Sequence, residues 1–254
     1  MRLRNQTIYF RGSRIAFNHA HDIAGIVETH VLDVYHSEKI VIGSLVLDFG
    51  AGIGDFTVLA SKQVGPKGLV VSIEPSPADF STLLSNIELN SLANVIPVNV
   101  AVGSASGSEV LRFKGRTVSA KTRNLYAILE DNNIDVYDFN AVFIKMDIEG
   151  FETGTLMDIG DLLLKCDTIA IELHGTRSKV DCILLPMGFT FVRFNSKRGL
   201  LKSLKFLLSN PIASLTLLWY LILGHELPTP RKLLKGIDIA SSPDLMVGIY
   251  TRGG

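Results

Sequence analysis

Acidic and imidazole side chains gather after two apolar segments in the second half of the chain. Asp147 and Glu149 follow the apolar residues 141–146, and His174 follows the apolar residues 168–173. Packed carboxylates raise one another's pKa and an imidazole titrates near neutral pH, so such a group can take a proton from a hydroxyl. His174 is the first candidate for a general base, with Asp147 or Glu149 as its orienting partner or as the alternate base. A hydrogen-bonded structural histidine is the competing interpretation.

The same side chains are also suitable ligands for a divalent metal ion. No tight ligand spacing demands a metal, so we expect none. Glu152 comes at the start of a predicted helix, where the helix dipole favours an acid, and we expect this role rather than catalysis. Glu172 ends the strand that carries His174.

A glycine-rich stretch earlier in the chain predicts a binding loop. Residues 46–58 read VLDFGAGIGDFTV, where an apolar run ends at Asp48 and is followed by Gly50, Gly52 and Gly54. The pattern indicates a buried strand, a tight turn and a helix N-terminus. Glycines let the backbone approach a ligand closely, and the helix start offers free N–H groups to a polar ligand.

A second apolar strand, residues 69–73, ends in Glu74. An acid in this position suits a pair of ribose hydroxyls. The loop reads D-x-G-x-G-x-G rather than the dinucleotide fingerprint G-x-G-x-x-G. A structural turn in some other Rossmann-like protein is the competing interpretation of the loop.

The loop and its downstream acid resemble those of the class I S-adenosylmethionine (SAM) methyltransferases. In order, LDFGAGIGDFT, IEPSP, LLSNIELNSLANV, VNVAVGSASG, FIKMDIEGFE and IAIELHG together resemble the FkbM family of methyltransferases, over about residues 46–175. The most specific piece is IKMDIEGFE, since members of that family carry a KxDxEGxE pattern there. This chain departs from the family in the loop, where members often read GAN and it has Gly50–Ala51–Gly52, and in a long segment before its last strand.

The resemblance implies a Rossmann-like, doubly wound α/β fold with a seven-stranded sheet, and SAM as the cofactor. Gly50, Ala51 and Gly52 would lie against the methionine and ribose parts of SAM. Glu74 would bind the ribose hydroxyls, and Asn99 and Ala101 would lie near the adenine. The cofactor-binding residues implied are Asp48, Gly50, Ala51, Gly52, Glu74, Asn99 and Ala101. Asp147 would face the cofactor amino group or the incoming nucleophile.

The implied reaction is O-methylation of a hydroxyl on a sugar, glycolipid or small metabolite. Two other functions stay open. One is a nucleotide-cofactor oxidoreductase on a similar sheet, against which the missing G-x-G-x-x-G speaks. The other is a membrane-associated protein that binds SAM without turnover.

We expect one methyltransferase domain over residues 1–254. Its parts are an N-terminal hairpin and helix (1–45), a SAM-binding core (46–194), an apolar helical insert (195–243) and a last strand (244–254). Further strands are expected over residues 94–102, 108–113, 141–146, 168–173, 189–194 and 245–250, and helices over 77–90, 123–133, 151–164 and 177–185.

The N-terminal part is expected to form a hairpin of Thr7–Phe10 with Ser13–Phe17, and then a helix over 23–35. Glu28, His30 and His36 lie on or near that helix. They form either a solvated helix face or a contact to cofactor or substrate.

The insert carries a run without charged side chains from Phe206 to Gly224, flanked by lysines and arginines. Its apolarity fits a membrane span, but a single crossing would separate the last strand, which pairs antiparallel to the sixth, from its sheet. Asn210–Pro211 breaks the run, so we expect two helical pieces. They form either an apolar hairpin on a membrane surface, through residues 200–224, or a lid or subunit contact.

Bulk composition adds weaker constraints. The 254 residues are 47% hydrophobic, which fits a full α/β core. Basic and acidic residues number 25 each, so we expect no nucleic-acid partner, only a small-molecule, glycan or lipid acceptor and a possible homodimer. Two cysteines, Cys166 and Cys182, and the lack of an apolar N-terminal stretch favour a cytoplasmic location, with membrane association left open.

Overall fold

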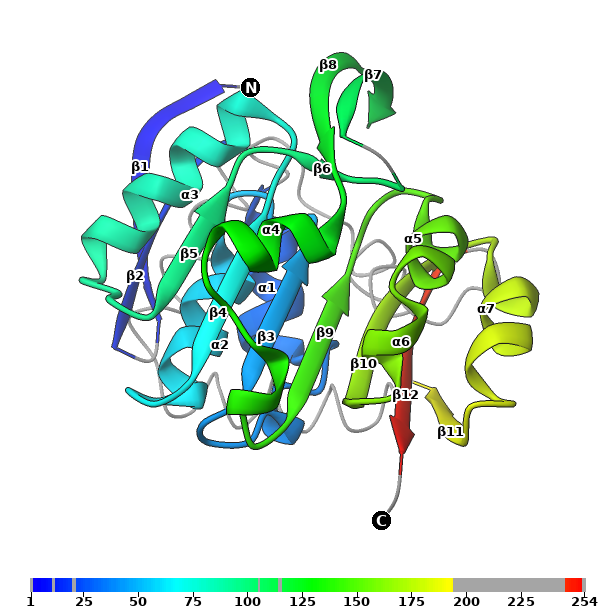
Figure 1. Ribbon diagram of the computed structural model, residues 1–254. Coiled ribbons are helices and arrows are strands. Elements are labelled where there is room, and N and C mark those ends of the chain that lie inside the picture. The colour runs from blue at the N-terminus through cyan, green and yellow to red at the C-terminus, as the bar shows by residue number, and fades with distance from the viewer. Residues whose placement is uncertain are drawn as a thin grey trace.

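A seven-stranded sheet forms the centre of the computed structural model, which describes residues 2–10, 12–19, 22–104, 106–113, 116–193 and 245–252 (Figure 1). In spatial order the strands are β11 (Phe189–Arg193), β12 (Leu245–Arg252), β10 (Cys166–His174), β9 (Val142–Met146), β3 (Leu45–Phe49), β4 (Leu69–Ile73) and β5 (Val95–Val98). All neighbours are parallel except β12, which is antiparallel to β10 and β11. This confirms the doubly wound sheet, with the last strand inserted beside the sixth.

The strand order reverses between β3 and β9. From β3 the chain builds β4 and β5 on one side, and it then returns to build β9 and β10 on the other. In open α/β sheets, ligands bind outside the carboxyl ends of the strands at such a point. The fold therefore directs attention to the residues that follow β3 and β9.

Helices cover both faces of the sheet. They are α1 (Asp22–Val27), α2 (Asp55–Val64), α3 (Pro77–Leu89), α4 (Leu125–Asp131), α5 (Glu152–Asp158), α6 (Gly160–Leu163) and α7 (Arg177–Leu184). Shorter turns are a π-helix (Glu28–Leu32) and two 3₁₀ turns (Ser37–Lys39 and Val136–Asp138). Strand β3 shows why two layers form, because side chains alternate along a strand. Leu45 and Leu47 pack with α4 to α7, whereas Val46 packs with α2.

The predicted third strand is interrupted. Strand β5 ends at Val98, and the chain continues as β6 (Ala101–Val102) in a separate sheet with β7 (Gly107–Phe113) and β8 (Arg116–Arg123). The break coincides with Asn99, whose side-chain amide donates to the Glu74 carbonyl oxygen at 2.8 Å. A side chain that bonds to a neighbouring backbone competes with the regular ladder.

Two predicted helices are also interrupted. The helix expected over 23–35 is α1 followed directly by the π-helix, and the helix expected over 151–164 divides into α5 and α6 at Ile159. Single π turns inside helical segments are frequent at functional sites.

The N-terminal hairpin is confirmed as β1 (Arg2–Phe10) paired with β2 (Ser13–His19). It docks on α3 through side-chain amides. Asn86 accepts from the Ala16 N–H at 2.6 Å and donates to the Ala16 carbonyl at 3.0 Å, and Asn90 makes the same pair of bonds with Arg14. The backbone N–H and C=O groups of Arg14 and Ala16, on the edge of β2, are thus paired by side chains as they would be by a neighbouring strand.

The predicted apolar insert, residues 195–243, lies outside the described residues. Among the residues that are described, no helix combines the length and apolarity needed to cross a bilayer.

Candidate active site

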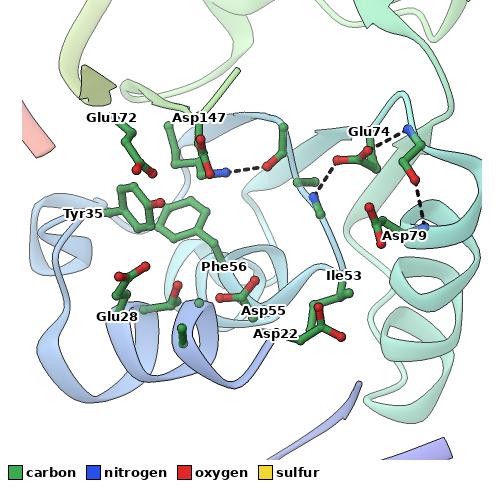
Figure 2. A pocket seen from close by; sticks show the side chains of 18 of the residues that line it. Asp22, Glu28, Tyr35, Ile53, Asp55, Phe56, Glu74, Asp79, Asp147 and Glu172 are labelled. Carbon is green, nitrogen blue, oxygen red and sulfur yellow. Dashed lines mark hydrogen bonds between the residues drawn. The ribbon is translucent and has the colours of Figure 1, made fainter. Parts of the chain in front are cut away.

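A cavity of about 480 Å³ lies at the carboxyl ends of β3, β4, β9 and β10 (Figure 2). The volume falls within the range of small-molecule and cofactor sites. One wall comes from the residues that follow these strands, including Gly50, Gly52 and Glu74. The opposite wall comes from α1 and the π-helix, including Glu28. The N-terminal extension therefore closes the site rather than standing apart from the core.

Two glycines of the loop serve different purposes. Gly50 has φ +73°, and a Cβ there would overlap the carbonyl oxygen of Asp147, so this glycine lets the β3 and β9 loops pack together. Gly52 has φ +56° and would place a Cβ in open space. Because Gly52 lines the cavity, a side chain there would meet no neighbouring atom at its Cβ, and its cost would be the strain of the left-handed backbone.

Glu74 lines the cavity, as predicted, although it is only 1% exposed. Its carboxylate accepts hydrogen bonds from the N–H groups of Gly52 at 2.8 Å and Ser76 at 2.7 Å. Burial raises the pKa of Glu74 to about 7 against the opposing effect of these bonds. The acid and the glycine loop are thus held as one unit.

Asp48 does not reach the cavity. It is fully buried beneath the glycine loop, where it accepts from the Thr57 hydroxyl at 2.7 Å and pairs with Lys145 at 3.2 Å. Lys145 also donates to the Gly50 carbonyl at 2.6 Å. Burial alone would lower the pKa of Lys145, but the charge of Asp48 and of other nearby acids raises it. This corrects the expectation that Asp48 contacts the cofactor, because the ion pair supports the loop from below.

Replacing Lys145 with methionine should destabilise the protein by about 3–5 kcal/mol, since an unpaired charge would be left buried. The double variant Lys145→Met/Asp48→Asn should lose clearly less stability, because the orphaned charge is removed. Urea denaturation of both variants measures the difference. A loss below about 1 kcal/mol for Lys145→Met would contradict the role given to the ion pair.

Asn99 and Ala101 do not line the described cavity either. Asn99 bonds to the backbone of Glu74, so it supports the acid rather than the ligand. Ala101 lies in β6 and pairs with Thr122. Gly50, Ala51, Gly52 and Glu74 are the predicted cofactor residues that the cavity brings together.

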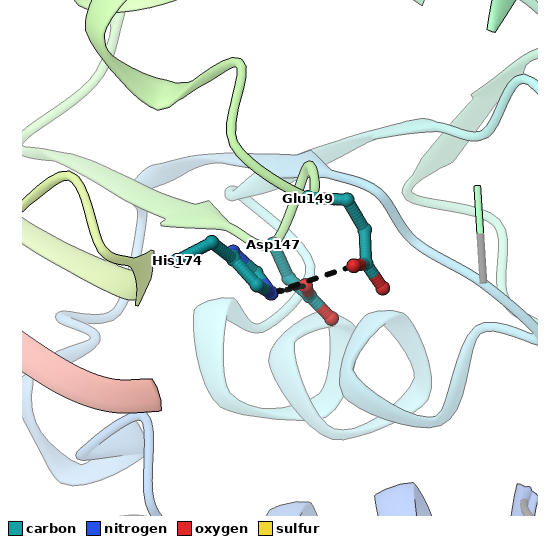
Figure 3. Close-up of side chains that lie close together, drawn as sticks. All are labelled: Asp147, Glu149 and His174. Atoms are coloured by element: carbon teal, nitrogen blue, oxygen red, sulfur yellow. Dashed lines mark ion pairs between the residues drawn. The ribbon is translucent and has the colours of Figure 1, made fainter. Parts of the chain in front are cut away.

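The three predicted catalytic residues lie together (Figure 3). His174 Nε2 is 4.0 Å from Asp147 Oδ1 and 3.7 Å from Glu149 Oε2. Asp147 and Glu149 line the cavity, whereas His174 is not among its lining residues. Glu149 has φ +53°, a backbone conformation that non-glycine residues adopt rarely and that recurs at functional sites.

His174 is not a free imidazole. Its Nδ1 lies 2.8 Å from Oε1 of Glu152. Partial burial would lower the pKa of His174, but the bond to Glu152 and the charges of Glu172 and Asp147 raise it to about 9. A histidine that keeps its proton near pH 7 is a poor general base, which corrects the first choice for that role.

Glu152 does more than interact favourably with the dipole of its helix. It begins α5, is fully buried, and accepts from the Gly150 N–H at 2.8 Å and the Thr176 hydroxyl at 3.1 Å. With these bonds and the contact to His174, the carboxylate is fully engaged. Glu152 therefore positions His174.

Several lining residues were missed by sequence reasoning or left without a role. Tyr35 and Asp55 line the cavity beside Glu28, which was left open between solvent and ligand. Glu172 also lines it, and burial together with the charges of Asp147 and Glu28 raises the pKa of Glu172 to about 8. Asp55 could have been predicted as a lining residue, because it begins the helix that directly follows the glycine loop.

His30 and His36 fit neither interpretation offered for them. Both are buried, at 1% and 3% exposure, and neither lines the cavity. His30 Nε2 lies 3.0 Å from the Asp55 carbonyl oxygen, so it ties the π-helix to the start of α2.

The family model described as the methyltransferase FkbM domain matches residues 48–206, which is more than half of the chain. The chain belongs to the FkbM methyltransferase family. The predicted family is thereby confirmed, and with it SAM as the cofactor of these methyltransferases.

Individual relatives of this FkbM protein cover less of it. A stretch of 103 residues is 32% identical to Methyltransferase 1 of Beauveria bassiana and covers 41% of this chain and 40% of that protein. A stretch of 54 residues is 48% identical to a tRNA(Phe) (4-demethylwyosine(37)-C(7)) aminocarboxypropyltransferase of Methanocaldococcus jannaschii and covers 21% of each. The matches thus span well under half of these curated relatives.

Solved structures are more distant. The crystal structure of M. jannaschii TYW2 in complex with AdoMet is 18% identical and has a TM-score of 0.42, covering 75% of this chain and 78% of that one.

Proposed function

We propose that this FkbM-family protein transfers the methyl group of SAM to a hydroxyl of an uncharged acceptor, such as a sugar, glycolipid or small metabolite. One observation carries the proposal. A single cavity joins the Gly52–Glu74 unit to Asp147 and Glu149. The residues that would hold the nucleoside and the carboxylates that would accept the proton therefore line the same cavity.

The charge of the cavity supports a cationic cofactor. Its lining carries the carboxylates of Asp22, Glu28, Asp55, Glu74, Asp79, Asp147, Glu149 and Glu172. Lys145 is the one lysine or arginine among the lining residues of the described part, and it is paired with Asp48. Such a field attracts a sulfonium and repels a pyrophosphate. It therefore disfavours the oxidoreductase alternative, and it disfavours nucleic acid as the acceptor.

The residues present fit SAM. The open space over Gly52 leaves room for a ligand against the loop, and Glu74 offers carboxylate oxygens to hydroxyl donors. Gly50, Ala51 and Gly52 would hold the cofactor by their backbone, while Glu74 would hold its ribose. The carboxylates around Asp147 would face the positive end of the cofactor.

When bound, SAM supplies a methyl group whose C–S bond breaks, leaving the electron pair on sulfur, as the acceptor oxygen forms the C–O bond. The chain must hold the acceptor hydroxyl in line and take its proton. Asp147 and Glu149 line the same cavity, and the carboxylate of one of them would take this proton. The wall that α1 and the π-helix contribute would exclude water from the reacting groups.

The test is transfer of labelled methyl from SAM into fractions of the source cell, with lipid, glycan and small-metabolite fractions assayed separately. We expect label in one of these fractions and none in RNA. Label in RNA alone would overturn the acceptor class. Binding of SAM with no transfer to any fraction would favour the alternative without turnover.

The binding of S-adenosylhomocysteine should depend on pH through Glu74. Its pKa of about 7 in the free protein means that acid protonates the carboxylate that would accept from ribose hydroxyls. The affinity should therefore fall about tenfold from pH 8 to pH 6. Calorimetry across this range measures the change. Glu74→Gln should bind more weakly and lose most of the pH dependence, and an unchanged slope in that variant would assign the effect to another group.

Membrane contact through residues 200–224, a homodimer and a cytoplasmic location stay predictions. The lysines and arginines that flank the apolar run favour an anionic surface as the first membrane to test.

A further inference from the structure

We propose that Asp147, Glu149 and His174 form a binding site for one divalent metal ion at the acceptor end of the cavity. The three side chains each offer one ligand atom, and these atoms lie within 4.8 Å of one another. This reverses the expectation from sequence spacing that no metal is bound. The binding site stands on its own geometry, while its use in catalysis rests on the proposed function.

The distances around His174 leave room for an ion between its Nε2 and the two carboxylates. Its Nδ1 lies 2.8 Å from Glu152, which is ordinary for a hydrogen bond. Its Nε2 lies 3.7 Å from Glu149 and 4.0 Å from Asp147, which is beyond hydrogen-bonding range. Two ligand atoms that share an ion at about 2.1 Å are themselves separated by about 3–4 Å. The gap in front of Nε2 therefore has the size of an ion.

Glu152 gives His174 the orientation that a metal ligand requires. Metal-binding histidines commonly donate their second N–H to a carboxylate, which fixes the ring and its tautomer. Here the buried carboxylate of Glu152 takes that place and is itself held by Gly150 and Thr176. Nδ1 is thereby engaged as a donor, and Nε2 points toward Asp147 and Glu149, where a bound cation would take the place of the Nε2 proton (Figure 3).

The surroundings also favour a cation and leave it accessible. Glu172 lies 3.8 Å from His174 Nε2, so a third carboxylate adds negative charge to the site. The nearest basic side chain on β9, Lys145, is occupied by Asp48. Asp147 and Glu149 are 23% and 25% exposed and line the cavity, so an ion there would keep open positions for water and for an acceptor oxygen.

Mixed nitrogen and oxygen ligands suit Mn²⁺, because carboxylates favour Mg²⁺ and Mn²⁺ and imidazole favours later transition metals. An ion bound to the acceptor hydroxyl would lower its pKa and help it lose its proton. The ion would thus supply the activation that His174, already engaged with Glu152, cannot supply as a free base.

The test titrates Mn²⁺ into the full chain after dialysis against EDTA, with free Mn²⁺ followed by electron paramagnetic resonance. We expect one saturable site per chain. Asp147→Asn and Glu149→Gln should each weaken it by about tenfold or more, and Glu152→Gln by about 10–100-fold through the orientation of His174. Asp161→Asn, an exposed acid of α6 away from the cavity, is the matched control and should bind Mn²⁺ as the unaltered chain does.

A spectroscopic measurement on the unaltered protein tests the proposal even if the variants fail to fold. Electron spin echo modulation of the bound Mn²⁺ should show coupling to one imidazole nitrogen. The proposal would be overturned by the absence of a saturable site, by the absence of nitrogen coupling, or by a Mn²⁺ affinity in both carboxylate variants equal to that of the unaltered chain. S-adenosylhomocysteine binding by the EDTA-treated protein tests the cofactor half separately, so cofactor binding without a Mn²⁺ site would reject the metal alone.

Discussion

Replacing Gly52 with arginine should weaken the binding of S-adenosylhomocysteine by about 100-fold or more, which is about 2.7 kcal/mol. A side chain at Gly52 points into open space within the cavity, so the arginine would occupy the volume that the cofactor needs. The fold should survive, because the expected cost is that of a left-handed residue, about 1–2 kcal/mol. Calorimetry gives the affinity and thermal unfolding gives the stability.

Two control variants separate bulk from backbone strain. Gly52→Ala carries the same strain with little bulk and should lose much less affinity. Gly188→Arg introduces the same side chain at a left-handed glycine between α7 and β11, also with open space around its Cβ, and should bind as the unaltered protein does. Equal affinities for Gly52→Arg and Gly188→Arg would show that the glycine loop does not hold the cofactor.

Replacing Asp147 with asparagine should lower the turnover number for methyl transfer by about 10²–10⁴-fold. The variant keeps the shape of the side chain but removes the charge that would accept a proton or hold a metal ion. Because Asp147 also lines the cavity, some loss of cofactor affinity is expected, but it should be far smaller than the loss of turnover. Single-turnover kinetics with labelled SAM separates the two effects.

Asp161→Asn is the control for this change as well, since it removes an exposed carboxylate outside the cavity and should retain full turnover. If Asp147→Asn transferred methyl groups at near the normal rate, the carboxylates after β9 would be structural. The catalytic group would then have to be sought among other lining residues, with Glu172 first.

The residues that end parallel strands were predictable from local sequence. Glu74 and Asp147 each follow an apolar run, and the carboxyl ends of parallel strands share one edge of a sheet, so their convergence required only the strand order. The hairpin and the inserted last strand were predictable for similar reasons, because alternation and turn residues are local signals.

Roles that depend on partners distant in sequence were not predictable. Asp48 and Lys145 are direct neighbours in the register of β3 and β9, and only that register shows that they neutralise each other. The engagement of His174 by Glu152 likewise depends on how α5 packs beside the end of β10. Each residue can be explained locally, Glu152 as an acid at a helix start and His174 as a polar residue at a strand end. Neither explanation points to the contact between them.

The predicted ends of helices and strands were wrong where side-chain hydrogen bonds or tertiary packing override the hydrophobic periodicity of the sequence. The apolar positions from Ile23 to Val34 fit a regular helix, yet the second half is a π-helix whose His30 bonds to the backbone of Asp55. Asn99 ends β5 early by bonding to the Glu74 backbone. The π-helix contributes Glu28 to the cavity wall, and Asn99 bonds to the backbone of Glu74, which also lines the cavity.

Calorimetric titration of the unaltered protein with S-adenosylhomocysteine, with NADH in a parallel titration, tests the central claim most directly. The acidic cavity and the Gly52–Glu74 unit predict saturable binding of one S-adenosylhomocysteine per chain and no binding of NADH. Binding of NADH without S-adenosylhomocysteine would contradict the assignment of this cavity to a sulfonium cofactor.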